Sequence, residues 1–264
     1  MTLSIITINY NNLEGLRKTI DSVISQTWHD FEWIIIDGGS TDGSKELIEE
    51  TANKLAASDF NPLSYWCSEP DKGIYNAMNK GIKHCNGEYL NFMNSGDTFY
   101  KSNTIESVFS TQYTEDVLYG DVYFQNGEEK YFHKLPENIT LLNYLRKDFI
   151  NHQSCFIRRE RQLQHMYDES FKISADTEFF MFSLTQGAKF RYLNIPIAIY
   201  ALGGLSSSNL SLCHQDENLA ITKNVVEQFL PWEFISFFNF YRKNNFNKKM
   251  IHLLIKIGKI INTH

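Results

Sequence analysis

The sequence predicts an α/β protein with a mostly parallel central sheet and a mixed second half. In the first hundred residues, apolar runs of strand length alternate with segments whose apolar residues recur every three or four positions. This alternation is typical of βαβ units, in which successive strands lie parallel. No linker rich in Pro or Gly divides the first 230 residues. We therefore expect one domain, residues 1–230, followed by a helical tail, residues 231–264.

Each element of the first half follows from its own pattern. Continuous apolar runs predict strands at residues 3–8, 33–36, 63–67 and 87–93. Asn11 followed by Glu14 is similar to a capping box and predicts a helix start there. Apolar residues at helical spacing predict further helices that begin at Ser44 and Ile74, the second ending near Asn86-Gly87.

The second half is predicted to begin with an antiparallel hairpin. Asn126-Gly127, between the strand patterns of residues 117–124 and 128–133, is a strong type I′ turn signal. Gly203-Gly204 marks a flexible loop after the last predicted strand. The other predicted elements are helices at residues 140–147, 174–187 and 213–229 and strands at residues 153–157 and 195–202.

Composition excludes several classes of protein. Of the 264 residues, 42% are hydrophobic and 21% are charged, which fits a globular domain rather than a disordered chain. No apolar run approaches the ~18 residues of a membrane span, and the short run Leu3–Ile8 lacks the basic segment of a signal peptide. The four cysteines are far apart and include no Cys-x-x-Cys pair, which favours thiols in a reducing compartment. We expect a cytoplasmic protein.

The charge distribution separates the tail from the rest of the chain. All 31 acidic residues precede Phe234, whereas six of the 25 basic residues follow it. An acidic body with a basic tail is not the pattern of a nucleic-acid-binding protein. Because basic residues interleave with large apolar ones, the tail predicts a pair of basic amphipathic helices. Two roles remain open for it: docking on the anionic inner face of a membrane, or packing on the domain or on the second subunit of a homodimer.

Polar residues follow the apolar runs at the points where three predicted strands end. They are Asn9, Asp37 and, after the turn Asn94-Ser95-Gly96, Asp97. Ligands of open α/β sheets bind at the carboxyl edge of the strands, so these residues predict a binding site. Each also has a purely structural explanation, because Asn and Asp cap helices and stabilise turns.

Three longer stretches resemble the nucleotide-sugar half of family 2 glycosyltransferases, which have the GT-A fold. They are Ser4–Asn11, Ile34–Asp42 and Glu69–Ile82, and the turn Asn94–Asp97 follows them in the order that the family has. The resemblance covers roughly residues 1 to 225 and is absent from the tail. It implies a nucleoside diphosphate sugar as the donor. The residues implied to bind the donor are Thr7, Asn9, Tyr10, Asp37, Asp71, Lys72, Asn79, Asn94 and Ser95.

The metal motif departs from the usual pattern of the family. That motif is Asp-x-Asp or Asp-Ala-Asp-Asp, and here Asn94 and Gly96 occupy positions of carboxylates, so that only Asp97 is left to hold a cation. A hard cation takes most of its oxygen ligands from phosphates and water, so one protein carboxylate can suffice. The resemblance therefore implies Mn²⁺ or Mg²⁺ at Asp97, and a simple strand-ending turn is the alternative.

The resemblance also implies an acceptor site in the second half. Ser174–Phe180 resembles the acidic motif that opens a helix in the family. Displacement at an anomeric carbon needs a base for the attacking hydroxyl, and Asp176 would be that base, with Glu178 as the second choice. A helix N-terminus favours the ionised form of either carboxyl group.

Three further residues are candidates near the acceptor or the closing loop. Asn151-His152-Gln153 resembles a family segment beneath the acceptor site, although a single His is more often structural. Gly204 belongs to a loop that is expected to close over the donor. His214 would then approach the diphosphate or the metal.

Taken together, these features predict an inverting, metal-dependent glycosyltransferase that uses a UDP sugar and a glycan or lipid-linked glycan acceptor in surface polysaccharide or lipopolysaccharide synthesis. Inversion is implied by the resemblance, because family members act by a single displacement. Two other classes stay open. A nucleotidyltransferase would need a glycine-rich phosphate loop with a basic residue where Asn9-Tyr10-Asn11-Asn12 stands. A non-catalytic sugar or nucleotide binder would fit the incomplete metal motif.

Overall fold

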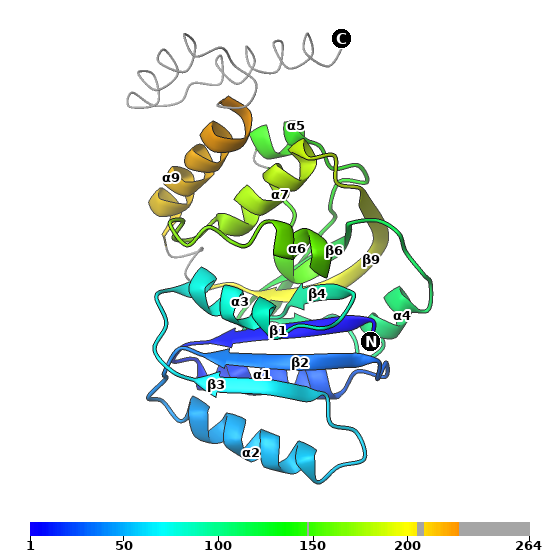
Figure 1. Ribbon diagram of the computed structural model, residues 1–264, viewed down its shortest axis with the longest axis vertical. Coiled ribbons are helices and arrows are strands. Elements are labelled where there is room, and N and C mark those ends of the chain that lie inside the picture. The colour runs from blue at the N-terminus through cyan, green and yellow to red at the C-terminus, as the bar shows by residue number, and fades with distance from the viewer. Residues whose placement is uncertain (147, 205–208, 227–264) are drawn as a thin grey trace.

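A single mixed sheet carries the fold. The computed structural model describes residues 1–146, 148–204 and 209–226. These residues form nine strands paired in the order β3-β2-β1-β4-β8-β6-β9-β5, with β7 beside β6. β1 (Leu3–Asn9) lies between β2 (Phe31–Asp37) and β4 (Tyr89–Phe92) and is parallel to both, and β3 (Leu63–Ser68) is parallel to β2. The predicted α/β class with a parallel first half is confirmed (Figure 1).

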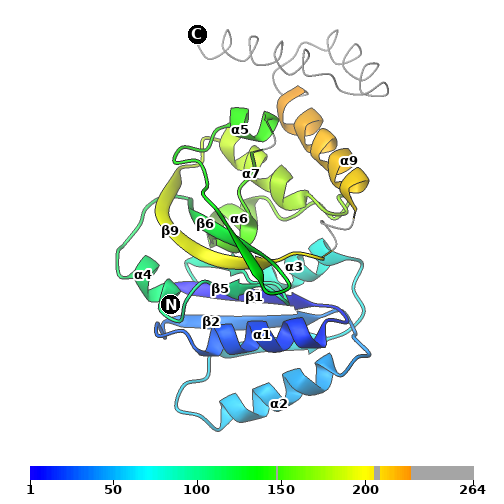
Figure 2. The same ribbon diagram turned by 180° about the vertical axis from the view of Figure 1, so that it is seen from behind.

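Helices cover both faces of the parallel half. α1 (Leu13–Ile24) and α2 (Ser44–Ala56) pack on one face, and α3 (Ile74–Lys83) packs on the other (Figures 1 and 2). Because side chains alternate along a strand, the odd-numbered apolar residues of β2 contribute to the core with α1 and α2, and the even-numbered ones to the core with α3. Gly81 allows close packing, since a Cβ there would lie 2.5 Å from Ile6 Cγ2.

The second half extends the sheet in both orientations. β8 (Cys155–Arg158) runs antiparallel to β4 and to β6 (Val117–Asn126). β9 (Phe190–Ala201) runs parallel to β6 and curves across the molecule in both views (Figures 1 and 2). The helices that share a core with α3 are α5 (Leu141–Leu145), α7 (Ala175–Thr185) and α9 (Leu210–Ile221), the last continued by a π-helical turn, Thr222–Val226.

Some short elements and boundaries differ from the prediction. α9 begins at Leu210, and β9 is longer at its start than predicted. A periodic apolar pattern needs more residues than the shortest elements contain, so the sequence does not reveal them. The short elements are β5 (Thr98–Phe99), α4 (Thr104–Phe109), a 3₁₀ turn (His152–Ser154) and α6 (Arg159–Gln164).

Two turn predictions are corrected by the backbone. The cap of α1 is Asn12, whose Oδ1 accepts a hydrogen bond from Gly15 N at 3.2 Å, while Asn11 adopts φ +47°. The hairpin between β6 and β7 (Glu129–His133) turns at Gly127-Glu128, because Asn126 already pairs with Glu129. Of these two loop residues only Gly127 has positive φ, at +61°, so the turn is not type I′.

Part of the prediction falls outside the described residues. The excluded residues are Lys147, 205–208 and 227–264, so the tail of residues 231–264, its membrane or dimer role and the domain boundary near residue 230 stay sequence predictions. Within the described ranges, no helix has the length and apolar character needed to cross a bilayer. Cys85 and Cys155 are buried and not in disulfides, as expected.

Candidate active site

A cleft of about 790 Å³ opens at the carboxyl edge of the parallel strands. The chain runs from β1 outward to β2 and β3 and then crosses to β4 on the other side of β1. Such a switch point is where open α/β sheets bind ligands, and the volume suits a small molecule. We divide the lining into two parts, called walls here. The first comprises the loops after β1, β2, β3 and β4 with part of α3, and the second comprises lining residues between 149 and 153, 173 and 177, and 200 and 204 with part of α9.

The Asp37 carboxylate joins the ends of three strands. Its Oδ1 accepts hydrogen bonds from Asn9 Nδ2 at 2.7 Å and Ser40 Oγ at 2.6 Å, and its Oδ2 accepts from Ser40 N at 2.9 Å and Ser68 Oγ at 2.6 Å. Burial alone would raise the pKa of this carboxyl, but the bonds from Ser40, Ser68 and Asn9 hold the pKa below its ordinary value. Asp37 therefore positions the lining loops and is not itself part of the described lining.

Gly38 leaves room in the cleft that the Asp71 side chain occupies. A Cβ atom at position 38 would lie 2.7 Å from Asp71 Oδ2 and 3.1 Å from Tyr10 Cδ2. The other oxygen of this carboxylate, Oδ1, accepts a hydrogen bond from Gly73 N at 2.8 Å, which holds the group at the start of α3. Tyr10 lines the cleft and is 67% exposed. A carboxylate oxygen and an exposed aromatic ring thus lie close together in the first wall.

The remaining predicted donor residues separate into two groups. Thr7, Lys72 and Asn79 do not belong to the described lining. The Thr7 hydroxyl donates to Met93 O at 2.9 Å inside the core, the Lys72 side chain is exposed, and Asn79 Nδ2 donates to Tyr167 O at 2.8 Å, joining α3 to the second half. These three side chains lie in the core, at the surface and at the contact with the neighbouring segment, and their part in donor binding stays a prediction. The predicted donor residues that do line the cleft are Asn9, Tyr10, Asp71, Asn94 and Ser95.

Asp97 lies in the wall of the cleft but is only 5% exposed. Ala201 N donates to its Oδ1 at 2.9 Å, and Gln153 Nε2 donates to its Oδ2 at 3.0 Å. Burial raises the pKa of Asp97 to about 6, although these two bonds and the nearby His152 act in the opposite direction. The carboxylate therefore connects the turn after β4 with the end of β9 and with the 3₁₀ turn.

The residues present do not form a cation site by themselves. Both oxygens of Asp97 already accept N–H groups, and Asn94 directs its amide nitrogen toward His152. Across the described ranges, no three His, Cys, Asp or Glu side chains are grouped so that they could hold a metal ion. A cation here would need most of its oxygen ligands from a bound molecule. The Asp and Glu side chains of the described lining are Asp71, Asp97, Asp176 and Glu217.

Asp176 stands in the first turn of α7, in the second wall of the cleft. His152 Nδ1 lies 2.9 Å from Asp176 Oδ2, and the Tyr75 hydroxyl lies 3.1 Å from Oδ1. The other ring nitrogen of His152, Nε2, lies 3.2 Å from Asn94 Nδ2. Three residues predicted from separate segments are thus brought into contact. A partly exposed carboxylate at a helix N-terminus has the charge and access that a general base needs.

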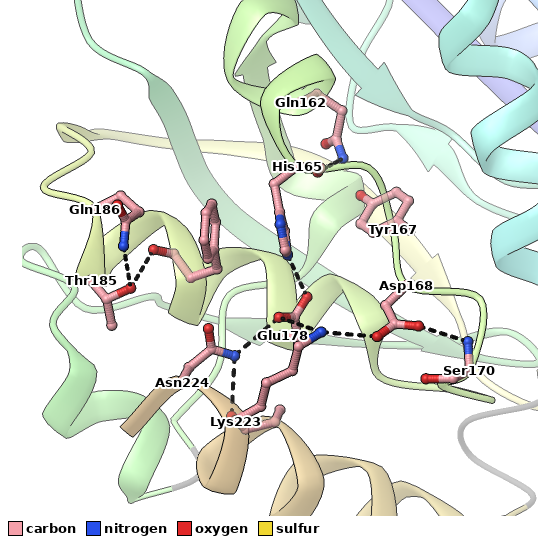
Figure 3. A network of polar contacts seen from close by, with 12 residues as sticks. Gln162, His165, Tyr167, Asp168, Ser170, Glu178, Thr185, Gln186, Lys223 and Asn224 are labelled. Carbon is pink, nitrogen blue, oxygen red and sulfur yellow. Dashed lines mark hydrogen bonds and ion pairs between the residues drawn. The ribbon is translucent and has the colours of Figure 1, made fainter. Parts of the chain in front are cut away.

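Glu178, the second choice for the base, belongs to a different network (Figure 3). It is fully buried, accepts hydrogen bonds from His165 Nε2 at 2.9 Å and Asn224 Nδ2 at 3.1 Å, and lies 3.6 Å from Lys223 Nζ. Burial would raise its pKa, but His165, Asn224 and Lys223 hold the pKa below its ordinary value. Glu178 is not in the described lining, and its contacts connect α7 with the turn after α9. Its role as the alternative base stays a prediction.

The same network predicts a pH dependence of stability. Lys223 Nζ lies 2.9 Å from Asp168 Oδ2, and although burial acts to raise the pKa of Asp168, its bonds with Lys223 and Ser170 lower the pKa from 3.8 to about 2 (Figure 3). A carboxyl with a depressed pKa stabilises the fold above its unfolded pKa, and this contribution is lost as the pH falls from about 4 to about 2. Urea unfolding should show the stability difference between the wild type and Asp168→Asn shrinking over that interval. A difference that stays constant would contradict this assignment.

Three residues that hold parts of the site in place were not predicted from the sequence, because nothing in their local pattern marks them. Gln153 holds Asp97, and Tyr75 contacts Asp176. Asp216 of α9 is buried, and its Oδ2 accepts hydrogen bonds from the backbone N–H groups of residues 172, 173 and 174, which fixes the segment that leads into α7.

Two further predicted residues lie in different places. Gly204 lines the cleft, whereas the predicted His214 is exposed and is not in the described lining.

Comparison with known sequences points to one family. Residues 4–175 match the sequence model of glycosyl transferase family 2. An uncharacterized glycosyltransferase of Mycobacterium tuberculosis (strain ATCC 25618 / H37Rv) is 42% identical over 99 residues, which are 37% of this chain and 35% of that protein. A PGL/p-HBAD biosynthesis glycosyltransferase of Mycobacterium bovis (strain BCG / Pasteur 1173P2) is 29% identical over 211 residues, which are 78% of this chain and 79% of that protein.

Solved structures share the fold. S. aureus TarS 1–349 in complex with UDP has a TM-score of 0.63 at 19% identity, covering 85% of this chain and 66% of that one. The mannosyltransferase PcManGT from Pyrobaculum calidifontis, in complex with GDP-Man and Mn²⁺, has a TM-score of 0.64 at 13% identity, covering 99% of this chain and 80% of that one. The sheet order and these likenesses identify the GT-A fold. Because the family match extends over most of the described residues, the chain belongs to glycosyl transferase family 2.

Proposed function

We propose that the chain transfers a sugar from a nucleoside diphosphate donor, with UDP as the nucleotide, to a hydroxyl group of a glycan or lipid-linked glycan. The observation that carries the proposal is a single cleft with Tyr10, Gly38 and Asp71 in one wall and Asp176 with His152 in the other. The proposed nucleotide site and the proposed catalytic base for an acceptor hydroxyl thus lie in the same cleft. Family membership and the name of the mycobacterial relative, a PGL/p-HBAD biosynthesis glycosyltransferase, support the transfer of a sugar.

The proposed reaction is a single displacement with inversion. The acceptor oxygen attacks the anomeric carbon of the sugar while a carboxylate oxygen of Asp176 takes its proton. The bond from the anomeric carbon to the diphosphate oxygen breaks, and its electron pair leaves with the diphosphate. Attack from the face opposite the leaving group inverts the configuration. Proton removal by a positioned base typically contributes about 10²- to 10⁴-fold to the rate.

A divalent cation, Mn²⁺ or Mg²⁺, is proposed as part of the donor complex. The Asp and Glu side chains of the described lining put negative charge around the place where a diphosphate would lie. A bound cation supplies the charge neutralisation that a diphosphate needs as a leaving group. Asp97 is the proposed protein ligand, with the diphosphate supplying further oxygens. The Mn²⁺ bound with GDP-Man in PcManGT supports this arrangement.

Recognition of the nucleobase is proposed for Asp71 and Tyr10. Asp71 Oδ2 occupies the space that Gly38 leaves free, and both residues line the cleft. A carboxylate oxygen accepts hydrogen bonds, so it favours a base with a ring N–H, such as uracil or guanine, over cytosine, whose corresponding ring nitrogen is an acceptor. The exposed Tyr10 ring offers a face for stacking.

The full chain and a panel of nucleotide sugars test the proposed function. Thermal shift with UDP, GDP and CDP sugars, each with and without Mn²⁺, should show stabilisation by UDP sugars that depends on Mn²⁺. Release of UDP from the stabilising donor should then be measurable, because water replaces an absent acceptor slowly. Stabilisation without any UDP release would favour a non-catalytic binder. An absence of stabilisation by every nucleotide would contradict the proposal.

Asp71→Asn should weaken UDP binding and change nucleotide preference. The amide replaces a charged acceptor, so UDP affinity should fall by about 10-fold, the size typical of a lost hydrogen bond to a charged group. Because the new amide adds an N–H donor, the difference between the affinities for UDP and CDP should become smaller. Calorimetry in the presence of Mn²⁺ measures both affinities. Glu69→Gln is the matched control, because Glu69 pairs with Lys80 and is not in the described lining. An unchanged ratio of UDP to CDP affinity would remove Asp71 from base recognition.

A further inference from the structure

Asn94, His152 and Asp176 form a continuous line of polar contacts from the metal-motif turn to the first turn of α7. Asn94 Nδ2 lies 3.2 Å from His152 Nε2, and His152 Nδ1 lies 2.9 Å from Asp176 Oδ2. The His152 side chain is 13% exposed and the Asp176 side chain 17% exposed, so both contacts are largely shielded from water. The Phe92 ring lies edge-on to the His152 ring, with the ring centroids 6.3 Å apart.

The orientation of the Asn94 amide is coupled to the nitrogen of His152 that carries a proton, and in this structure the NH₂ group faces Nε2. An NH₂ group can only donate, so the Nε2 atom that faces it must accept and must be unprotonated. A neutral imidazole then carries its proton on Nδ1, the atom that faces the Asp176 carboxylate. In this arrangement the Asp176 carboxylate accepts a hydrogen bond from a neutral donor. A carboxylate at position 94 would instead favour a proton on Nε2.

We propose that Asn94 and His152 act as positioning residues that orient Asp176 and keep it available as the base, and that the Asn at the first position of the metal motif serves this role. The inference rests on the proposed function, in which Asp176 deprotonates the acceptor hydroxyl. His152 Nδ1–H holds Oδ2, and Tyr75 lies against Oδ1, so the carboxylate plane is set by contacts on both oxygens. A group that orients a reacting side chain typically contributes about 10- to 100-fold to activity.

The protonation of His152 depends on the orientation of the Asn94 amide. The Asn94 Oδ1 atom is buried and has no hydrogen-bond partner among the described residues. If the amide were rotated by half a turn, Oδ1 would face Nε2, which would then need a proton. Together with the proton facing Asp176, this would make His152 an imidazolium and Asp176 one half of an ion pair. The two arrangements predict different protonation of one ring, which is measurable.

The first test is spectroscopic and does not depend on activity. Nitrogen-15 NMR of histidine-labelled full chain distinguishes neutral Nδ1–H, neutral Nε2–H and imidazolium rings. The His152 signal is the one that disappears in His152→Asn. We expect neutral Nδ1–H in the wild type at pH 7.5 and a protonated Nε2 in Asn94→Asp. An imidazolium or an Nε2–H ring in the wild type would overturn the proposal, whether or not a donor has been found.

The second test separates positioning from binding. His152→Ala should lower kcat by about 10- to 100-fold and leave the KM for the donor within about twofold, while His152→Asn should recover most of kcat because its amide N–H occupies the place of Nδ1–H. Asn94→Asp should resemble His152→Ala. His84→Asn is the matched control, since His84 is exposed and stacks on Tyr65 away from the described lining.

The outcomes distinguish this proposal from the one on which it rests. If Asp176→Asn abolishes turnover and the kcat of His152→Ala stays within about twofold of the wild-type value, Asp176 is supported as the base. The positioning role of His152 is then wrong. If Asp176→Asn retains turnover, the chain is still a transferase but Asp176 is not its base, and the positioning role is overturned with that assignment. If no donor gives turnover even in the wild type, the proposed function is wrong, and the NMR test still decides the protonation of His152. If His152→Asn is as impaired as His152→Ala, the Nδ1–H contact is not what matters, and the positioning role is again overturned.

Discussion

Asp176→Asn is expected to retain the fold and the donor affinity while turnover falls by about 10²- to 10⁴-fold. The amide has the shape of the carboxylate, and its oxygen can still accept the hydrogen bond from His152 Nδ1. An amide, however, is not basic enough to take the proton of the acceptor hydroxyl. The proposed nucleotide contacts lie in the other wall of the cleft, so they are not disturbed. Rates of UDP release give kcat, and calorimetry gives the UDP affinity.

Glu178→Gln is the control for Asp176→Asn. It makes the same chemical change on the same helix, two residues further along the chain, but in the buried network with His165 and Asn224. We expect it to lower the midpoint of thermal unfolding and to leave turnover near the wild-type value at temperatures where it is folded. Turnover that survives in Asp176→Asn but is lost in folded Glu178→Gln would exchange the roles of the two carboxylates.

Asp97→Ala is expected to abolish transfer and also to destabilise the protein. The substitution removes the acceptor of the Ala201 N–H and of the Gln153 amide. Leaving donors of this kind unsatisfied costs about 1–3 kcal/mol, which urea unfolding can measure. This result would revise the simpler expectation that a metal ligand at a cleft can be removed without affecting the fold. The structural effect must therefore be separated from the effect on the cation.

Asp97→Asn removes the negative charge while hydrogen bonds with Ala201 and Gln153 can still form. Its amide oxygen can still accept from Ala201 N, and the Gln153 amide can rotate to accept from the new NH₂ group. We expect near wild-type stability but loss of the Mn²⁺-dependent stabilisation by UDP. Asp121→Asn is the control, because Asp121 is a buried carboxylate that accepts from Leu135 N at 2.9 Å and is not in the described lining. Mn²⁺-dependent UDP binding that persists in Asp97→Asn would place the cation ligand elsewhere.

The first half of the fold was predictable because its signals are local. The parallel strands β1 and β2 are buried on both faces, so each appears in the sequence as an apolar run. The helices between them carry an apolar face at a period that the sequence displays directly. The second half was less predictable, since β5 has two residues and β9 is paired with β6 and β5, which are distant in the sequence.

By itself, the sequence determined the fold class, the resemblance to family 2 glycosyltransferases and the identity of Asp176 as a candidate base. The tertiary structure alone decided which polar residues share a space. Asp37, Asn79 and Glu178 carry the right chemistry, yet their polar atoms already form hydrogen bonds within the chain and they lie outside the described lining. Conversely, the contact of Asn94 with His152 joins residues that are 58 positions apart. Sequence patterns report which face of an element is buried, whereas a hydrogen-bond partner across the fold depends on how the elements pack, and no local pattern encodes that.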